Sequence, residues 1–237
     1  MTAPRSGRFG ALAAALLGSA LTLASAATAQ ADPSLDAAEA LARDTFYEGV
    51  PSEAARELDA AGIERLIEML GDPAEAPHHA QILEVLGMSG RRDVYAAVAT
   101  AAAEEPTGEI DRAKLRKRVA VLVALGHLAR DDDRALADLE AAVQVEATRA
   151  PRWRHGPLGG ERLSGLMRRS AVSALVISGR PEARATLQRL EADADDDPEF
   201  EKHVRSALRH LERESGRAGE PGASGVRDAP RGRGVGR

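Results

Sequence analysis

The chain has 237 residues, with 32 lysines and arginines against 37 aspartates and glutamates, and therefore a formal net charge of −5. This mildly acidic balance argues against a general nucleic-acid binder. The absence of cysteine excludes disulfides, thiolate nucleophiles and cysteine-ligated zinc. Aromatic residues make up only 3%, fewer than ligand pockets and base-stacking platforms usually contain. Alanine and leucine dominate the apolar residues, which predicts an all-α fold.

Residues 1–31 have the pattern of a secretory signal peptide. Arg5 and Arg8 give a positive start, residues 11–27 are apolar, and Ala29-Gln30-Ala31 has the small-x-small form of a cleavage site. An uncleaved membrane anchor is the alternative, but the apolar run is short for a span and contains serine, threonine and glycine. We therefore expect export to the periplasm or the extracellular space. The mature chain would have 206 residues, a net charge of −7 and no membrane span.

The mature chain begins with a segment at 32–51, in which we expect a helix over 36–45 followed by a linker. A first pair of helices is predicted within 52–73, because Ile63, Leu66, Ile67 and Leu70 recur at the spacing of one helical face. Such helices are too short to be stable alone in water, so each requires packed neighbours.

The second pair, within 77–105, is the clearest. Ile82, Leu83 and Leu86 share one face of its first helix. Gly87 leaves room for another helix to pack closely, and Gly90 suits a left-handed helix end. We expect this segment to belong to the core.

The same pattern returns twice. Leu125-Gly126 repeats Leu86-Gly87 at an offset of 39 residues, and Leu175 repeats Leu125 at an offset of 50. Glu104 to Gly108 is predicted to be a linker. A last helix, apolar on one face only, suits the capping element that ends a repeat array; its apolar residues are Phe200, Val204, Leu208 and Leu211. Residues 215–237 are rich in Gly, Arg and Pro, which predicts a disordered basic tail.

Three segments, ILEVLGMSGRRDVYAAV, VLVALGHLARDDDRALADL and SALVISGRPEARATLQRL, resemble HEAT repeats of the bacterial type. They share a first helix rich in small residues that ends in Leu-Gly or a close variant, a turn, and a second helix containing leucine. The resemblance covers about 52–214. It implies an α-solenoid of about four helix pairs with a C-terminal capping helix. Such repeats generally act as scaffolds and binding surfaces.

The larger offset exposes an insertion at 149–163, RAPRWRHGPLGGERL, which holds the only tryptophan and is basic. Inserted loops between repeats often carry function. One interpretation is a recognition loop for an acidic partner, with a hydrophobic anchor surrounded by arginines; its residues are Arg149, Arg152, Trp153, Arg154 and His155. The alternative is a long connector whose tryptophan packs against the solenoid.

A second basic run opens the helix after the linker, with Lys114, Lys117 and Arg118 on one face, and Arg168 and Arg169 open the corresponding helix of the next repeat. Stacked, they would form a basic stripe suited to an anionic polymer. A solvated helix face is the alternative.

No pattern predicts a metal site, a cofactor or catalytic residues. The acidic run from Asp193 to Glu199 fails the spacing of a calcium loop and is expected to cap the last helix. The histidines form no ligand motif, and no GxSxG elbow is present.

The sequence therefore favours an exported, non-enzymatic scaffold that presents a helical-repeat surface to a protein partner. An anionic envelope polymer is a possible further ligand. One alternative is an enzyme accessory, or an enzyme whose site is assembled across repeats. Another is a structural envelope component that touches anionic surfaces through its basic tail.

Overall fold

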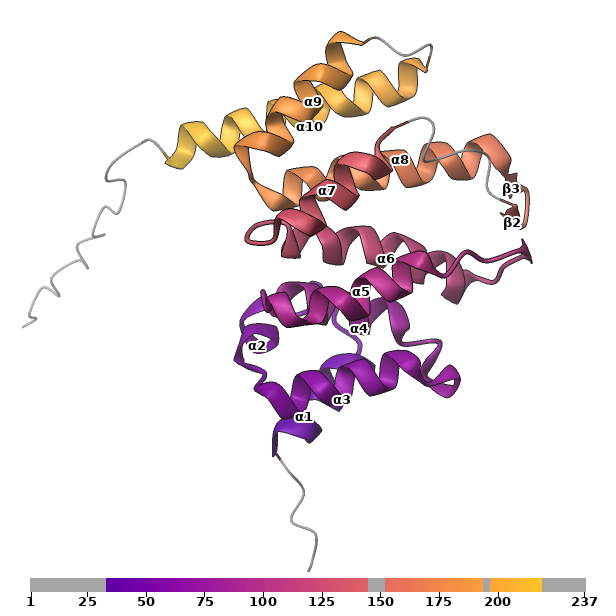
Figure 1. The fold of residues 1–237 in the computed structure, drawn as a ribbon, viewed down its shortest axis with the longest axis vertical. Helices are drawn as coiled ribbons and strands as arrows, with labels where there is room; N and C mark the ends of the chain where they lie inside the picture. The colour runs from indigo at the N-terminus through magenta and orange to yellow at the C-terminus, as the bar shows by residue number, and fades with distance from the viewer. Residues whose placement is uncertain (1–32, 145–151, 194–196, 219–237) are drawn as a thin grey trace, which may run out of the picture. The chain divides into compact units, whose positions relative to one another are not determined.

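The computed structural model describes residues 33–144, 152–193 and 197–218, all of which belong to the unit Asp32–Arg237. The expected signal peptide, Arg149 and residues 219–237 of the expected tail lie outside the described residues. The described chain is mostly helical, as predicted, and carries one small sheet (Figure 1). The helices are α1 (Pro33–Arg43), α2 (Ser52–Glu57), α3 (Ala60–Gly71), α4 (His79–Met88), α5 (Tyr95–Ala103), α6 (Arg112–Leu128), α7 (Asp133–Ala142), α8 (Gly160–Ser178), α9 (Pro181–Ala192) and α10 (Pro198–Ala218). Short 3-10 turns occupy Pro73–Glu75 and Arg92–Val94, and the strands are β1 (Gly108–Glu109), β2 (Trp153–His155) and β3 (Leu158–Gly159).

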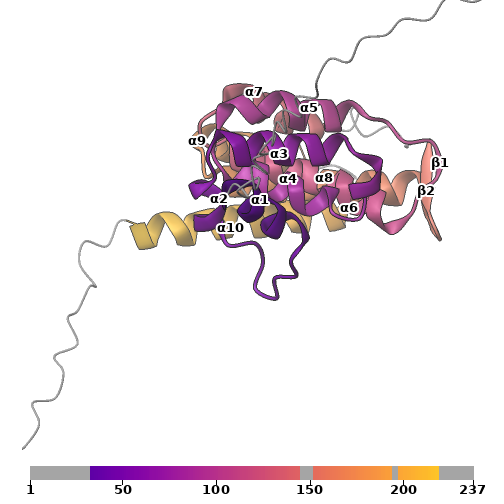
Figure 2. The same cartoon turned by 90° about the horizontal axis from the view of Figure 1, so that it is seen from below.

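The centre of the described unit is a row of three helices, in which α4 packs on α6 and α6 packs on α8. Helices α3, α5 and α7 lie on one side of this row, and α1, α2 and α10 lie on the other (Figure 2). One cluster of buried apolar side chains runs through the unit from α1 to α10. Among the described residues, no helix is long and apolar enough to cross a membrane.

The predicted core face of α4 is confirmed, because Ile82, Leu83 and Leu86 are fully buried. The predicted helix end is also confirmed: Gly90 has a φ of +69°, a left-handed value that other residues rarely adopt. Gly179, its counterpart after α8, has a φ of +66°. The two helices therefore end in the same way.

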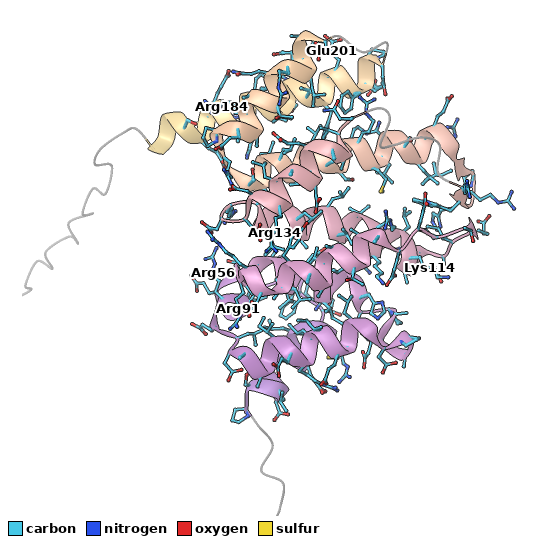
Figure 3. All side chains as sticks on the ribbon, viewed as in Figure 1. Arg56, Arg91, Lys114, Arg134, Arg184 and Glu201 are labelled. Atoms are coloured by element: carbon cyan, nitrogen blue, oxygen red, sulfur yellow. The ribbon has the colours of Figure 1, made fainter. Side chains whose placement is uncertain are left out.

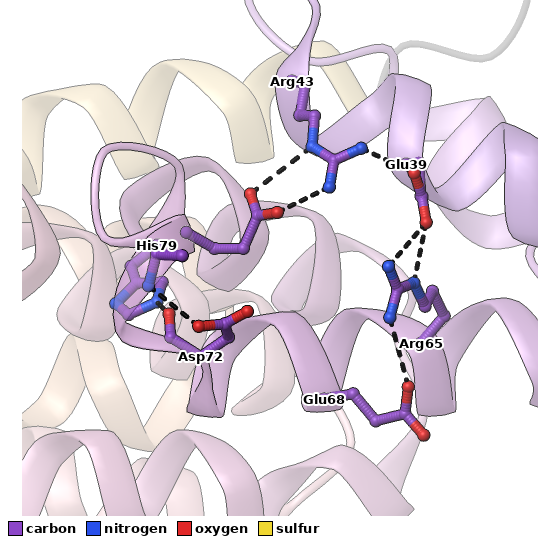
Figure 4. A network of polar contacts seen from close by, with 8 residues as sticks. Glu39, Arg43, Arg65, Glu68, Asp72 and His79 are labelled. Atoms are coloured by element: carbon purple, nitrogen blue, oxygen red, sulfur yellow. Dashed lines mark hydrogen bonds and ion pairs between the residues drawn. The ribbon is translucent and has the colours of Figure 1, made fainter.

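The start of the unit differs from the prediction, because α3 packs on α1 and α4 rather than pairing with α2. Helix α2 has only six residues and one buried side chain, Ala55, whereas α1 has a longer apolar face. Polar contacts add to this packing (Figure 4). Glu39 of α1 accepts from Arg43 of its own helix at 2.5 Å and pairs with Arg65 of α3 at 2.7 Å. Residues 33–51 are therefore continuous with the core.

The small sheet was not predicted. It combines β1, which begins at the last residue of the expected linker, with β2 and β3, which lie in the insertion. β1 pairs with β2 in parallel, and β2 pairs with β3 as an antiparallel hairpin. Gly156, with a φ of +52°, allows the turn. These strands are two or three residues long, so they carry no periodic signal that sequence analysis could detect.

The predicted start of the tail at 215 is also wrong, because α10 continues to Ala218. Ser215 donates a hydrogen bond from Oγ to the carbonyl oxygen of Leu211 at 2.8 Å. Arg184 of α9 donates to the same carbonyl at 3.0 Å and to Ser215 Oγ at 2.7 Å. These contacts hold the last described turns of α10 against α9.

Candidate functional site

The sheet encloses a small core of its own. Trp153 is only 4% exposed and packs with Ile110 and Leu163. Of the two interpretations of the insertion, the burial of Trp153 favours the connector whose tryptophan packs against the helices. Its indole is apolar and large, so burying it against the helices is more favourable than exposing it to water.

The polar residues of the insertion fasten the hairpin to β1. Arg154 forms an ion pair with Glu109 at 2.6 Å, and the backbone N–H of Gly156 donates to the same carboxylate at 2.8 Å. His155 donates from Nδ1 to the carbonyl oxygen of Ile110 at 2.9 Å. Arg152 is exposed. Of the described residues proposed for partner binding in this loop, Arg152 and Arg154 are the exposed ones.

Arg168, the next predicted site residue, is also buried. Its Nε donates to the carbonyl oxygen of Val143, just beyond α7, at 3.3 Å. Its guanidinium carbon lies 3.8 Å from the centre of the Phe200 ring, a cation–π contact with α10. Arg169 is half-buried, and its carbonyl oxygen accepts from Nε2 of His203 at 3.1 Å. The predicted basic stripe is therefore not a free surface at Arg168.

Arg118 of α6 has a similar role. Its Nη1 donates to the carbonyl oxygens of Ala102 at 2.7 Å and Glu104 at 2.9 Å, at the end of α5. Its neighbour Lys117 pairs with the Glu104 carboxylate at 2.7 Å. Of the three residues expected on one face, Lys114 alone remains exposed (Figure 3). These contacts satisfy carbonyl groups that a helix end leaves unpaired.

His79 lies seven residues before Leu86 in α4, as Arg118 lies seven residues before Leu125 in α6, and it is 7% exposed. Its Nε2 donates to the carbonyl oxygen of Asp72, which follows α3, at 2.9 Å (Figure 4). His79, Arg118 and Arg168 are separated by 39 and 50 residues, the spacings of the leucine pattern. Each of the three thus binds the carbonyl end of the helix before it. Sequence analysis missed this role, because a capping side chain carries no signal without knowledge of the helix it meets.

The opposite ends of the helices are rich in arginine, and Arg56, Arg91, Arg134 and Arg184 lie along this side (Figure 3). Two of these four arginines are paired with carboxylates. Arg91 pairs with Asp93 at 2.6 Å, and Arg134 pairs with Asp132 at 2.7 Å. This edge carries charges of both signs and therefore does not form a basic patch.

The acidic segment before α10 behaves as predicted in its described part. Asp197 Oδ1 accepts from the backbone N–H groups of Glu199 and Phe200, both at 3.1 Å, and so caps the helix. Within the described ranges, no group of three or more histidines, aspartates or glutamates is arranged to hold a metal ion.

A cavity lies where α5 and α7 both pack on α6, and we call it the α5–α7 groove. It has a volume of about 480 Å³, within the usual range of ligand pockets. Its apolar lining includes Ala99 of α5, Val121 of α6, Met167 of α8 and Trp153. The insertion thus contributes to this cavity through its buried tryptophan rather than through its exposed arginines.

The polar groups of the groove are few. Tyr95 of α5 donates from its hydroxyl to Asp138 of α7 at 2.8 Å, and this hydrogen bond is the main cause that raises the pKa of the tyrosine. Arg134 stacks over the same ring at 4.2 Å. Arg118 lines the groove as well, and burial lowers its pKa from the ordinary value. A mainly apolar cavity with a few placed polar groups can hold a peptide segment or a small molecule.

Comparisons of the chain with protein-family models and with curated proteins find no match.

Proposed function

We propose that this protein is an exported HEAT-like α-solenoid that acts as a non-enzymatic binding module, with the α5–α7 groove as the contact site for a segment of a protein partner. The observation that carries the proposal is the groove itself, an apolar cavity of about 480 Å³ between two helices of successive pairs. Repeat proteins commonly use the surface formed by equivalent helices to bind other proteins.

The repeat interpretation is supported by contacts that recur at the spacing of the sequence pattern. His79, Arg118 and Arg168 each bind the carbonyl end of the preceding helix. We infer that 52–214 forms about four helix pairs closed by α10, and that α1 supplements the first pair. Arg118 and Arg168, which were expected to bind an anionic polymer, take part in these internal contacts, so a protein segment suits the groove better.

Site-specific photocrosslinking tests the function. A photoreactive amino acid at Ala103, which is exposed and lines the groove, should capture a partner from the native envelope. The same group at Ala96, exposed on α5 but outside the groove lining, is the matched control. Capture from Ala103 should be lost when Ala99, half-buried in the groove, is changed to lysine. Equal capture from both positions would contradict the groove as the binding site.

Export has a separate test. If residues 1–31 are a cleaved signal, the protein isolated from the envelope should begin at Asp32. Mass spectrometry of the purified protein measures this directly. A chain that retains residues 1–31 would favour the membrane-anchor alternative.

A further inference from the structure

The guanidinium of Arg118 is only partly satisfied by the protein. Nη1 makes both of its good hydrogen bonds, to the carbonyl oxygens of Ala102 and Glu104. Nε is buried and has no hydrogen-bond partner. Nη2 has none among the described residues either. The edge of the guanidinium formed by Nε and Nη2 is the fork that binds a carboxylate with two parallel hydrogen bonds.

The charge of Arg118 is also uncompensated by any close ion pair within the described ranges. The carboxylates of Glu105 and Glu104 favour its charged form without forming an ion pair with it, and that of Glu104 is bound by Lys117 at 2.7 Å. His79, at the equivalent position of α4, donates from its ring to the backbone carbonyl oxygen of Asp72. A half-buried cation without a carboxylate is costly, since desolvation disfavours its charged form. An anionic ligand would remove this cost.

Ser164 supplies a second, independent indication. It lies on α8, lines the same groove, and has a buried hydroxyl oxygen without a partner. Buried donors are nearly always hydrogen-bonded in native proteins, so two unpaired donors in one cavity call for an explanation. An acceptor placed in the groove by a ligand would serve both.

We propose that the α5–α7 groove recognises a carboxylate attached to an apolar group, with the carboxylate bound by Arg118 and Ser164 and the apolar group packed against Trp153 and Met167. This inference rests on the proposed function and names the chemistry of the segment that binds. Glu105 and Asp138 also line the groove, so a monoanion fits better than a doubly charged phosphate. The carboxylate can come from a peptide or from a free aliphatic acid.

Trp153 provides the measurement, because it is the only tryptophan and lines the groove. Its fluorescence is followed while the purified protein is titrated with octanoate and with octanamide. A second pair of probes, acetyl-Leu-Leu with a free carboxylate and with an amide end, represents the peptide source. The acid of at least one pair should bind about tenfold more tightly than its amide, as expected for a hydrogen-bonded charge. The pair with the tighter acid identifies the source. Equal affinities of acid and amide in both pairs, or no binding, would overturn the proposal.

Variants assign the effect to the groove. Arg118→Gln should abolish the preference for the acid, whereas Arg116→Gln, which removes an exposed charge from the same helix outside the groove lining, should retain it. Since Arg118 also caps α5, circular dichroism must show that the variant is folded. Two further variants test the same contacts if Arg118→Gln unfolds. Arg118→Lys keeps the charge but lacks the two-pronged hydrogen-bonding edge, and Ser164→Ala lacks the hydroxyl. Each should lower the affinity for the acid severalfold. An unchanged preference in folded variants would contradict the assignment.

The two proposals fail separately. If acid and amide probes bind equally but Ala103 still crosslinks to a partner, the carboxylate proposal is wrong and the proposed partner-binding function is retained. Acid discrimination without any captured protein would contradict the protein partner and leave a small-molecule site.

Discussion

Gly87 of α4 lies directly against the backbone of Ala124 of α6, and a Cβ at Gly87 would stand 2.6 Å from the Cα of Ala124. The relationship recurs between α6 and α8, where a Cβ at Gly126 would stand 2.7 Å from the carbonyl oxygen of Ala174. Real Cβ atoms essentially never come so close to backbone atoms. The two glycines therefore set the distance between successive central helices.

Gly87→Ala should destabilise the protein by about 1 to 3 kcal/mol, because the added methyl group must push α4 and α6 apart in a close-packed core. Urea denaturation followed by circular dichroism measures the free energy of unfolding. Gly71→Ala is the matched control, since a Cβ there meets nothing within 4 Å and its φ is not positive. The control should be neutral or slightly stabilising. Equal effects at the two positions would contradict the packing role of Gly87.

The sequence predicted the parts of the fold that depend on periodic apolar residues. Ile82, Leu83 and Leu86 share a face, and the core is where that pattern places it. The Leu-Gly spacing located the packing of α4 on α6, because a missing Cβ is visible in a sequence. The packing of α3 on α1 could not be predicted from the sequence. Both α1 and α2 are short helices close to α3 in the chain, and no pattern indicates which of them packs on it.

The candidate site was predicted only in part. Trp153 was correctly singled out by its position in an insertion, yet its burial depends on Ile110, which lies in a distant loop. Arg168 and Arg118 were read as surface charge, because a helical pattern gives the spacing of basic residues but not the carbonyl groups they meet. The groove itself is formed by four helices and one strand, and no local pattern encodes such a cavity.

Arg168→Met should reduce stability by about 1 to 3 kcal/mol, since it removes a cation–π contact and leaves the carbonyl of Val143 without this donor. Methionine retains much of the apolar stem, so the loss reports mainly on the guanidinium. Arg162→Met, at an exposed position of the same helix, is expected to change stability by less than about 0.5 kcal/mol. Denaturant unfolding of both variants gives the change in the free energy of unfolding relative to the wild type. If Arg168→Met is as stable as the wild type, the internal role is contradicted and Arg168 is available for binding.

Trp153→Ala tests whether the insertion is part of the core. The side chain is 4% exposed, and removal of a buried tryptophan costs about 3 to 5 kcal/mol through lost packing and the cavity left behind. Tyr47→Ala serves as the control, because Tyr47 is 99% exposed and its removal should leave stability within about 0.5 kcal/mol. Thermal denaturation followed by far-ultraviolet circular dichroism gives the melting temperatures of the two variants and of the wild type. An unchanged melting temperature for Trp153→Ala would restore the view of Trp153 as a free anchor.

His127 should make stability depend on pH. Burial, with help from Arg130 and Arg56, lowers the pKa of its imidazole from 6.5 to about 4. The unfolded chain therefore binds a proton at a higher pH than the folded chain, so protonation favours unfolding. The contribution of the neutral ring is fully present above about pH 6.5 and is lost as the pH falls to about 4, below which both states are protonated.

Carboxylates such as Glu39 and Asp132, whose pKa values are lowered by hydrogen bonds to arginines, also cost stability in acid, so the wild-type curve alone cannot isolate the histidine. The difference between wild type and His127→Gln can. Between pH 7.5 and 4.5 the wild type should lose about 1 kcal/mol more than the variant, a value reduced for solvent screening of a half-buried ring. His210→Gln, at an exposed position of α10, should follow the wild type. Parallel curves for all three proteins would show that His127 accepts a proton in the folded state as readily as in the unfolded state, and would contradict its burial as a neutral ring.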